Sequence, residues 1–174
     1  MAKGSVEDLR IVLLDEGHDR AGFTCGVESL DGYLKTQAGQ DLRRKANAVF
    51  VLSERDEPAR VLGYYILCAI AISQGDVPPA ARRHVPRYPL VSATLIGRLG
   101  VAKERQGQRL GAVLLADALQ RVLESASTVG SSMIVVAALD EMAAGFYAAH
   151  GFVRLPESLR LVLPMRAAGG RDER

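Results

Sequence analysis

A short segment from Gln106 to Ala112, with glycines at positions 107 and 111, joins an apolar stretch to an amphipathic one. We interpret this junction as a strand, a tight turn and the first turns of a helix. Such a turn points several backbone N–H groups into one small space, with the positive end of the helix dipole behind them. A phosphate or pyrophosphate fits there without a lysine. The segment lacks the Gly-Lys-Ser/Thr of a P-loop and the Gly-x-Gly-x-x-Gly of dinucleotide sites.

Basic residues gather in one part of the chain. The formal net charge is +2, but Tyr33–Arg109 holds thirteen Lys/Arg and six Asp/Glu, against nine and fourteen elsewhere. This asymmetry favours one basic face and an anionic partner larger than a single cofactor. Solvated arginines, or an interface with another protein chain, are the alternatives. Two basic runs stand out: Arg43, Arg44, Lys45, Arg82, Arg83 and Arg87.

Composition places the chain among ordinary globular proteins, with 174 residues, 48% hydrophobic and 24% charged. We expect one domain over 1–166 and a polar tail over 167–174. The longest apolar run, Val61–Ile72, is too short to span a bilayer, and the first residues lack the apolar core of a signal peptide. Cys25 and Cys68 have no metal-ligand spacing, so we expect buried free thiols, no metal and a cytoplasmic location.

Hydrophobic periodicity predicts alternating strands and helices. Strands are expected over 10–14, 48–52, 61–73, 94–101, 132–139, 152–155 and 159–165. Helices are expected over 23–42 with a break near Gly39, 78–84, 110–122 and 141–150. The order β-α-β-β-α-β-α-β-α-β-β predicts an α/β (α+β) fold with a mixed sheet and helices on both faces.

Four separated stretches carry a resemblance to a known family: 23–34, 38–44, 83–89 and 138–152. With the turn at 106–111, they make the chain resemble GNAT acetyltransferases over essentially its whole length, and more narrowly the GNAT toxins of type II toxin–antitoxin systems (TacT-like, AtaT-like). The resemblance implies a mostly antiparallel sheet splayed between its fourth and fifth strands. It also implies acetyl transfer from acetyl-CoA to the α-amine on charged tRNA, which blocks translation. A ribbon-helix-helix antitoxin and a homodimer are the implied partners.

The resemblance assigns the turn to the coenzyme A pyrophosphate, as Gln106-x-x-Arg-x-Gly111 follows the family signature Gln/Arg-x-x-Gly-x-Gly/Ala. Arg109 stands where the signature has glycine. If the loop needs a positive φ there, arginine costs on the order of 1 kcal/mol, unless its guanidinium contacts a phosphate and compensates. Gly100 would allow the bulge that opens the sheet. The implied cofactor contacts are Leu99, Gly100, Val101, Gln106, Gly107, Gln108, Arg109, Leu110, Gly111, Ala112, Asp140 and Phe146. Asp140 also fits a helix cap.

Tyr147 is the catalytic residue that the resemblance implies, since a tyrosine at this position of GNAT enzymes reaches the sulfur. It would donate a proton or a hydrogen bond to the leaving thiolate. Full proton transfer from a phenol of pKa ~10 to a thiolate of pKa ~8.5 is uphill by about 2 kcal/mol. Either the site lowers the tyrosine pKa, or the hydroxyl stabilises developing charge. The alternative is a core tyrosine packed beside Phe146.

No general base stands out in the sequence. A free α-amine has a pKa of ~7.7–8.0 and needs little help to be neutral, which favours an α-amine acceptor over a lysine side chain. We expect Glu54 and Glu57 to be solvated, and His84 and His150 to be structural.

The basic runs would contact tRNA phosphates. Tyr88 would stack on a terminal base or pack at a strand edge. Two other functions remain open. One is a GNAT enzyme that acetylates a small-molecule amine or a protein N-terminus. The other is a non-catalytic acetyl-CoA-binding regulator or interaction module, which Tyr147 disfavours and the departure at Arg109 leaves open.

Overall fold

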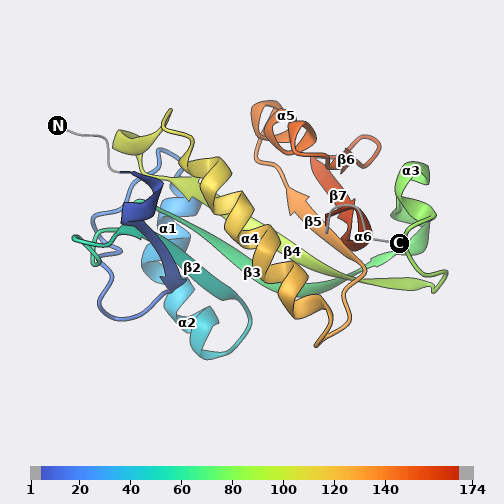
Figure 1. Ribbon diagram of the computed structural model, residues 1–174, viewed down its shortest axis with the longest axis horizontal. Helices are drawn as coiled ribbons and strands as arrows, with labels where there is room; N and C mark the ends of the chain where they lie inside the picture. The colour runs from blue at the N-terminus through green and yellow to red at the C-terminus, as the bar shows by residue number, and fades with distance from the viewer. Residues whose placement is uncertain (1–4, 169–174) are drawn as a thin grey trace. The chain divides into compact units, whose positions relative to one another are not determined.

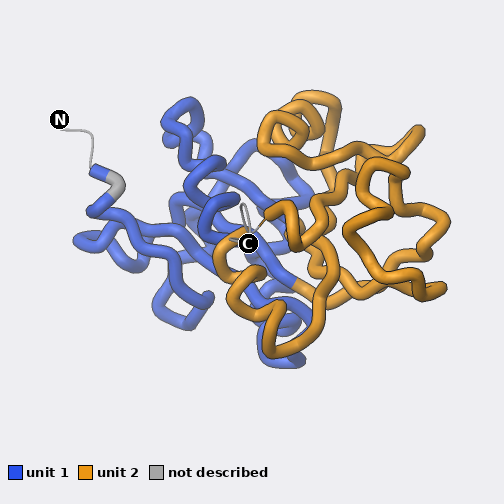
Figure 2. Tube along the Cα trace, turned by 45° about the vertical axis from the view of Figure 1, so that its right-hand side comes forward, with its two compact units in different colours: residues 1–67, 98–118 blue, residues 68–97, 119–174 orange. Residues whose placement is uncertain are grey.

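The computed structural model describes residues 5–168, which form two compact units. Unit 1 comprises Met1–Leu67 and Arg98–Ala118, and unit 2 comprises Cys68–Gly97 and Leu119–Arg174. Figure 2 draws them in blue and orange. The single domain expected over 1–166 stays a prediction. The tail expected over 167–174 begins within a helix at its first two residues, and the rest of it lies outside the described residues, as do the first four residues of the chain.

Unit 1 is built on antiparallel strands. Strand β1 pairs with β2, from Leu9–Glu54 to Leu13–Phe50, and β2 pairs with the first half of β3. The end of β4 and the first half of α4 also belong to this unit. Its elements are η1 (Val6–Asp8), β1 (Leu9–Leu13), α1 (Glu28–Thr36), α2 (Ala38–Arg43), β2 (Ala48–Glu54), β3 (Gly63–Ser73), β4 (Leu90–Val101), η3 (Lys103–Arg105) and α4 (Leu110–Ala126).

The two faces of the unit 1 strands are covered by different helices. Alternate residues of β2 and β3, such as Val49 and Tyr64, pack in one core with Leu34 of α1. On the other face the Tyr65 hydroxyl donates to Oδ2 of Asp117 in α4 at 2.6 Å. In Figure 1, α4 crosses in front of the strands and α1 lies behind them. Because both faces of β2 are covered, its sequence is a nearly continuous apolar run.

The helix expected over 23–42 is two helices, and it starts later than predicted. The chain turns at Gly26 (φ +90°) before α1, and α1 and α2 meet at Gln37 rather than at Gly39. Asp31 holds the turn, because its carboxylate accepts hydrogen bonds from the Cys25 N–H at 2.8 Å and the Thr24 hydroxyl at 3.0 Å. Burial opposes ionisation of Asp31, but these hydrogen bonds outweigh it and lower its pKa.

Unit 2 contains the one parallel strand pair among the pairings of the described residues. Strand β5 pairs parallel with β4, from Ala93–Met133 to Ile96–Val136, and antiparallel with β7, which also pairs with β6. The core includes Val91, Met133 and Val162. The further elements are η2 (Gln74–Asp76), α3 (Pro79–Arg82), β5 (Met133–Ala137), α5 (Glu141–Ala149), β6 (Val153–Arg154), β7 (Arg160–Pro164) and α6 (Met165–Ala168).

The strand order β1-β2-β3-β4-β5-β7-β6 confirms the predicted mixed, mostly antiparallel sheet. The pairing of β4 with β5 ends at Ile96–Val136, whereas β4 continues to Val101. This is where the resemblance implied that the sheet opens. Both cysteines are free; Cys25 is buried as expected, but Cys68 is half-buried. Burial raises the pKa of Cys25 to about 11, so its thiol is unreactive at neutral pH.

Gly63 gives a test of the packing in unit 1. A Cβ at this position would lie 2.9 Å from the Gly100 carbonyl oxygen and 3.0 Å from Leu114 Cδ1. We expect Gly63→Ala to lower the free energy of unfolding by about 1–3 kcal/mol through overpacking. Gly32 of α1 is the control, since a Cβ there meets nothing within 4 Å. Gly32→Ala should raise stability by about 0.5–1 kcal/mol. Urea denaturation measures both, and equal stabilities of the two variants would contradict this account.

Candidate active site

The loop before α4 presents a row of backbone N–H groups without partners. Throughout the part of the chain that the structure describes, no hydrogen bond is donated by the N–H groups of 107–112, and the first helical one runs from Val113 to the Arg109 carbonyl at 3.3 Å. Gly107 (φ +79°) and Arg109 (φ +62°) are left-handed, and Gln108 between them is not. Alternating handedness turns successive N–H groups into one concavity, which suits an anion.

The loop does need a positive φ at Arg109, which is the case considered in the sequence analysis. Its backbone is left-handed at the position where the family signature has glycine. For a residue with a Cβ this conformation costs on the order of 1 kcal/mol. Its side chain is exposed. The loop therefore keeps the glycine-like conformation without the glycine, and the charged side chain lies at the same place as the free N–H groups.

Side chains from distant elements hold this loop open. The Gln106 amide donates to the Cys25 carbonyl at 2.8 Å and to the Val101 carbonyl at 3.0 Å. Arg105 forms an ion pair with Glu54 and donates from Nε to Gln108 Oε1 at 2.8 Å. The expectation that Glu54 is solvated was wrong, because its side chain is only 27% exposed and paired. Sequence reasoning missed this pair, since the two residues lie 51 positions apart and no local pattern joins them.

The left-handed residue of β4 is Arg98, and the bulge expected at Gly100 stays a prediction. Arg98 is left-handed (φ +51°), and its guanidinium carbon stands 4.0 Å above the Tyr33 ring. Gly100 packs closely against α1: a Cβ there would lie 3.2 Å from Leu30 Cδ1. The left-handed arginine costs roughly 1–2 kcal/mol, and an exposed cation–π contact returns about 0.5–1 kcal/mol. Leu99, Gly100 and Val101 lead directly from this point to the loop.

Tyr147 lies on α5 in unit 2, whose ends follow their sequence signals. Asp140 caps the helix, with Oδ1 accepting from the Ala143 N–H at 2.8 Å, and left-handed Gly151 (φ +94°) ends it. The Tyr147 ring is packed between aromatic rings, 5.2 Å from Phe146 and 5.8 Å from Phe152. The ring is therefore a core residue, as one interpretation of the sequence expected. The catalytic interpretation stays possible, because a tyrosine with a buried ring can still have an accessible hydroxyl.

The Tyr147 hydroxyl is available although its ring is buried. The residue is 6% exposed, and its hydroxyl makes no hydrogen bond to another described residue. Between residues 5 and 168, the only fully buried side-chain nitrogen or oxygen without a hydrogen-bond partner is His18 Nε2. The Tyr147 hydroxyl oxygen is therefore accessible. Burial raises the pKa of Tyr147 to about 12. Full proton transfer to a thiolate of pKa ~8.5 is then uphill by about 5 kcal/mol. The raised pKa favours the alternative in which the hydroxyl stabilises developing charge.

The neighbours of Tyr147 have structural partners. His150 Nδ1 lies 2.7 Å from the Phe146 carbonyl, so this histidine has a structural contact as expected. Phe146 is half-buried, and Glu141 pairs with Arg154 through contacts of 2.6 and 2.8 Å. Glu141 hydrogen-bonded to Arg154 has a lowered pKa. Among the residues described, no group of His, Cys, Asp and Glu side chains could hold a metal ion. No helix among them is long and apolar enough to cross a membrane.

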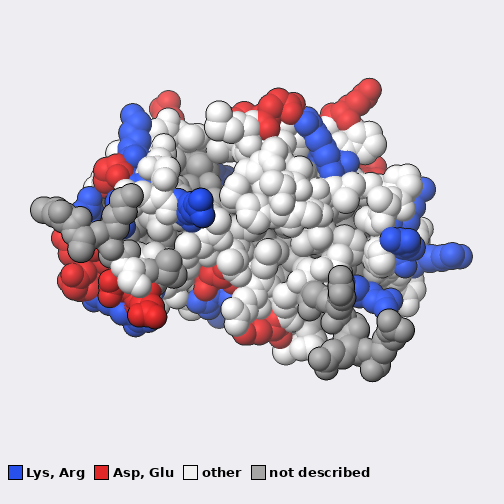
Figure 3. Space-filling model, turned by 45° about the horizontal axis from the view of Figure 1, so that its top comes forward, with Lys and Arg blue, Asp and Glu red and all other residues white. Residues whose placement is uncertain are grey.

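The two basic runs lie in different units. Arg43, Arg44 and Lys45 are exposed at the end of α2 in unit 1, and Lys45 (φ +56°) occupies the left-handed position after the helix. Figure 3 shows Lys and Arg side chains in separate groups on the face drawn. The expected single basic face stays a prediction.

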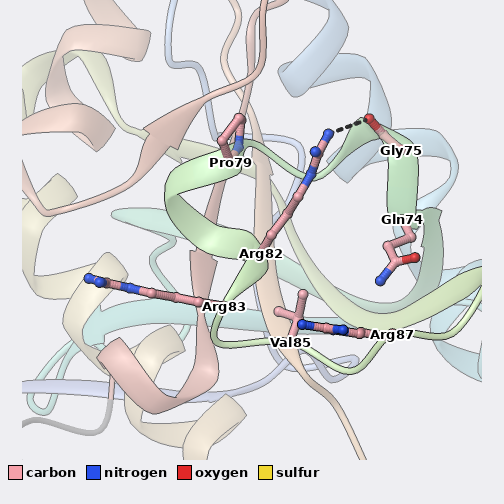
Figure 4. A pocket seen from close by; sticks show the side chains of 7 residues that line it. All are labelled: Gln74, Gly75, Pro79, Arg82, Arg83, Val85 and Arg87. Atoms are coloured by element: carbon pink, nitrogen blue, oxygen red, sulfur yellow. Dashed lines mark hydrogen bonds between the residues drawn. The ribbon is translucent and has the colours of Figure 1, made fainter.

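Arg82, Arg83 and Arg87 line a pocket of about 640 Å³ in unit 2, together with Gln74 and Val85. Arg82 is partly structural, because its Nε donates to the Val77 carbonyl at 2.8 Å and its Nη2 to the Gly75 carbonyl at 3.3 Å. Figure 4 shows Arg82 reaching toward Gly75 and Arg83 extending away from it. Tyr88 follows Arg87 in the sequence and is 66% exposed, and base stacking requires an exposed ring.

Comparisons with known proteins find relatives of the expected family but no family model. No family model matches the chain. Over 156 residues the chain is 34% identical to a tRNA-acetylating toxin of Mycobacterium tuberculosis, covering 89% of this chain and 91% of the relative. Over 159 residues it is 31% identical to a probable toxin TacT of Sinorhizobium fredii, covering 85% and 86%.

Solved structures share the fold. A tyrosine-to-phenylalanine mutant of KacT matches with a TM-score of 0.86 and 29% identity, over 93% of this chain and 98% of that one. AtaT complexed with acetyl-methionyl-tRNA matches with a TM-score of 0.84 and 30% identity, over 93% and 98%. AtaTR bound with acetyl-CoA matches with a TM-score of 0.81 and 30% identity, over 94% and 98%.

Substitutions at Arg109 separate backbone strain from ligand contact. Arg109→Gly should raise the free energy of unfolding by about 1 kcal/mol, and Arg109→Ala should not, because alanine keeps the left-handed penalty. Both variants should weaken acetyl-CoA binding about fivefold to tenfold if the guanidinium contacts a phosphate. Isothermal calorimetry and thermal unfolding make the two measurements. Unchanged acetyl-CoA affinity in both variants would remove the Arg109 side chain from the site.

Proposed function

Because this chain belongs to the family of tRNA-acetylating toxins, the GNAT acetyltransferases of toxin–antitoxin systems, we propose that it transfers acetyl from acetyl-CoA to the α-amine of aminoacyl-tRNA and so blocks translation. The observation that carries the proposal is the row of unpartnered N–H groups over 107–112. They suit the pyrophosphate of coenzyme A, and AtaTR, a structural relative, has been solved with acetyl-CoA.

The strand before the loop receives the reactive end of acetyl-CoA in this proposal. The backbone of Leu99, Gly100 and Val101 would bind the pantetheine arm and the thioester carbonyl. The pairing of β4 with β5 ends at Ile96, before these residues, which supports a free edge for the arm. Gln106 joins the end of this strand to the loop through the Val101 carbonyl. The pyrophosphate and the thioester would thus be held by one connected stretch of unit 1.

The substrate supplies most of the chemistry. The neutral α-amine attacks the thioester carbonyl carbon, the C–N bond forms, and the C–S bond of the tetrahedral intermediate breaks. The amine proton passes to water, and the Tyr147 hydroxyl donates a hydrogen bond to the departing coenzyme A thiolate. This role fits a phenol whose pKa is raised to about 12, because a hydrogen bond stabilises charge without proton transfer. A base is dispensable since the α-amine pKa is ~7.7–8.0 before the ester lowers it.

We assign tRNA contacts to the six basic residues; Arg82 is anchored to backbone carbonyls, and Arg83 donates from Nε to His84 Nε2 at 3.0 Å. Relatives have been solved with acetyl-methionyl-tRNA and with the antitoxin AtaR. We propose a ribbon-helix-helix antitoxin and a second copy of this chain as protein partners, and the cytoplasm as the place where charged tRNA and acetyl-CoA are both present.

Tyr147→Phe tests the catalytic assignment. The kcat for acetylation of charged tRNA should fall about 10²-fold, since one preorganised hydrogen bond to developing charge is lost. The acetyl-CoA Kd and the melting temperature should change little, because the ring packing is preserved. Labelled acetyl-CoA with charged tRNA at saturating concentrations measures the rate. Full activity of the variant would end the assignment.

The pH profile is part of the same test. The kcat/KM of the wild type should rise with pH and level off above the α-amine pKa. No descending limb is expected below pH 10, because Tyr147 stays protonated up to a pKa of about 12. Short reaction times protect the ester at the alkaline end. A descending limb below pH 10 that disappears in Tyr147→Phe would contradict the raised pKa of Tyr147, on which the choice of a hydrogen bond over proton transfer rests.

Charge reversal at Arg83 or Arg87 tests the tRNA surface in unit 2. Each of Arg83→Glu and Arg87→Glu should raise the KM for charged tRNA about tenfold and leave acetyl-CoA hydrolysis unchanged. Arg82 is avoided because its side chain holds two backbone carbonyls. Exposed Arg166 of α6 provides a control with the same change of charge, Arg166→Glu. If all three variants acetylate tRNA equally well, the pocket serves another purpose.

A further inference from the structure

Arg98 is an exposed arginine held in an unusual place. It lies in β4 directly before the segment assigned to the thioester, with φ +51°, and its guanidinium carbon stands 4.0 Å above the centroid of the Tyr33 ring. Left-handed backbone inside a strand is rare for a residue with a Cβ. The fold therefore keeps a costly conformation that fixes where this side chain points.

The Tyr33 ring beneath Arg98 is itself fixed. Its hydroxyl donates to Asp41 Oδ2 at 2.9 Å and accepts from Asn47 Nδ2 at 2.8 Å. Its other neighbour is Tyr64, stacked with 6.5 Å between ring centroids and 13° between ring planes. Tyr33 as a whole is only 7% exposed. Arg98 thus lies on a rigid platform rather than on a mobile side chain.

The N–H edge of the guanidinium is unused. Between residues 5 and 168, the Arg98 side chain makes no hydrogen bond and no ion pair; it contacts the aromatic face of Tyr33 and interacts at longer range with the Asp41 carboxylate. Asp41 is occupied by Gln37, Tyr33 and Asn47. A guanidinium that stacks through its face keeps its edge free for two parallel hydrogen bonds to a phosphate.

Other cations surround the same platform. A Cβ on Gly39 of α2 would lie 3.0 Å from Arg20 Nη1 and 3.3 Å from Arg43 Nη1, so these two guanidinium groups converge on α2. Helix α2 is bound to the Tyr33 hydroxyl through Asp41. Arg43 of α2 and Arg98 of β4 thus lie on two elements of unit 1 that both contact Tyr33.

We propose that Arg98 binds the phosphodiester that precedes the terminal nucleoside of charged tRNA. The inference rests on the proposed function and adds a residue to it. That phosphodiester is one nucleoside away from the aminoacyl ester, and Arg98 is one residue away from the segment assigned to the thioester. A bidentate contact there fixes the end of the tRNA strand so that the α-amine meets the thioester carbonyl, whereas the surface arginines hold the tRNA body.

Arg98→Gly is the most informative variant, because it removes the guanidinium and relieves the left-handed backbone. Arg98→Asn is the second, since asparagine tolerates this conformation and carries no charge. Arg55→Ala is the matched control: Arg55 is an exposed arginine of unit 1 whose Nε donates to the Glu7 carbonyl at 3.1 Å. The measurements are steady-state acetylation of charged tRNA, acetylation of an amino acid methyl ester, acetyl-CoA binding, and the salt dependence of tRNA binding.

We expect both Arg98 variants to raise the KM for charged tRNA at least about tenfold, with kcat and the acetyl-CoA Kd within twofold of the wild type, and Arg55→Ala to resemble the wild type. The slope of log K against log salt should become shallower by about one phosphate contact. The kcat/KM for the methyl ester, which has no phosphate, should stay unchanged. An equal loss with the methyl ester, or an unchanged salt slope, would overturn the assignment. A wild type that acetylates the methyl ester but not charged tRNA would instead overturn the proposed function together with it.

Discussion

The anion-binding loop depends on backbone donors that stay unpaired, and such donors must be held open by other parts of the chain. In an exposed turn such N–H groups bind water, which an anion can replace, so the loop must mainly keep them directed to one side. Gln106 fixes the loop by bridging the Cys25 and Val101 carbonyls, and Arg105 by linking Glu54 to Gln108. The segment before α1, the end of β4 and the end of β2 therefore all serve one loop of unit 1. Its positions are fixed by hydrogen bonds that run outside the loop.

Left-handed backbone marks the places where this chain accepts a local cost. Four described residues other than glycine have positive φ: Lys45, Arg98, Arg109 and Glu157. Glycine would be less costly at each position. Strain alone identifies no function. At Arg98 it coincides with a rigid aromatic platform, and at Arg109 with six free N–H groups. The strained backbone at Arg109 thus places a positive charge beside donors that suit an anion, and the one at Arg98 places it on an aromatic ring.

Sequence reasoning succeeded where the signal is local. The Asp140 cap, the Gly151 stop and the turn before α4 each follow from a few adjacent residues, and periodicity located the strands. It failed where the cause is a distant contact. Nothing near Glu54 announces Arg105, and nothing near Gly100 shows that Leu30 packs against it or that Arg98 is left-handed. The direction of the Tyr147 pKa also escaped, because burial by Phe146 and Phe152 is a property of packing.

The raised pKa of Tyr147 limits what kind of catalyst this is. A phenol with a pKa of about 12 is a poor proton donor to a thiolate, and an α-amine of pKa ~7.7–8.0 needs little help from a base. The reaction therefore relies on an acceptor that is nucleophilic on its own and a donor that is already activated as a thioester. What remains for the protein is to hold the two ends together, which is a task of positioning. A site of this kind selects its acceptor by how the rest of the acceptor is bound. Rigid phosphate contacts next to the thioester segment would then decide specificity more than any group that touches the amine.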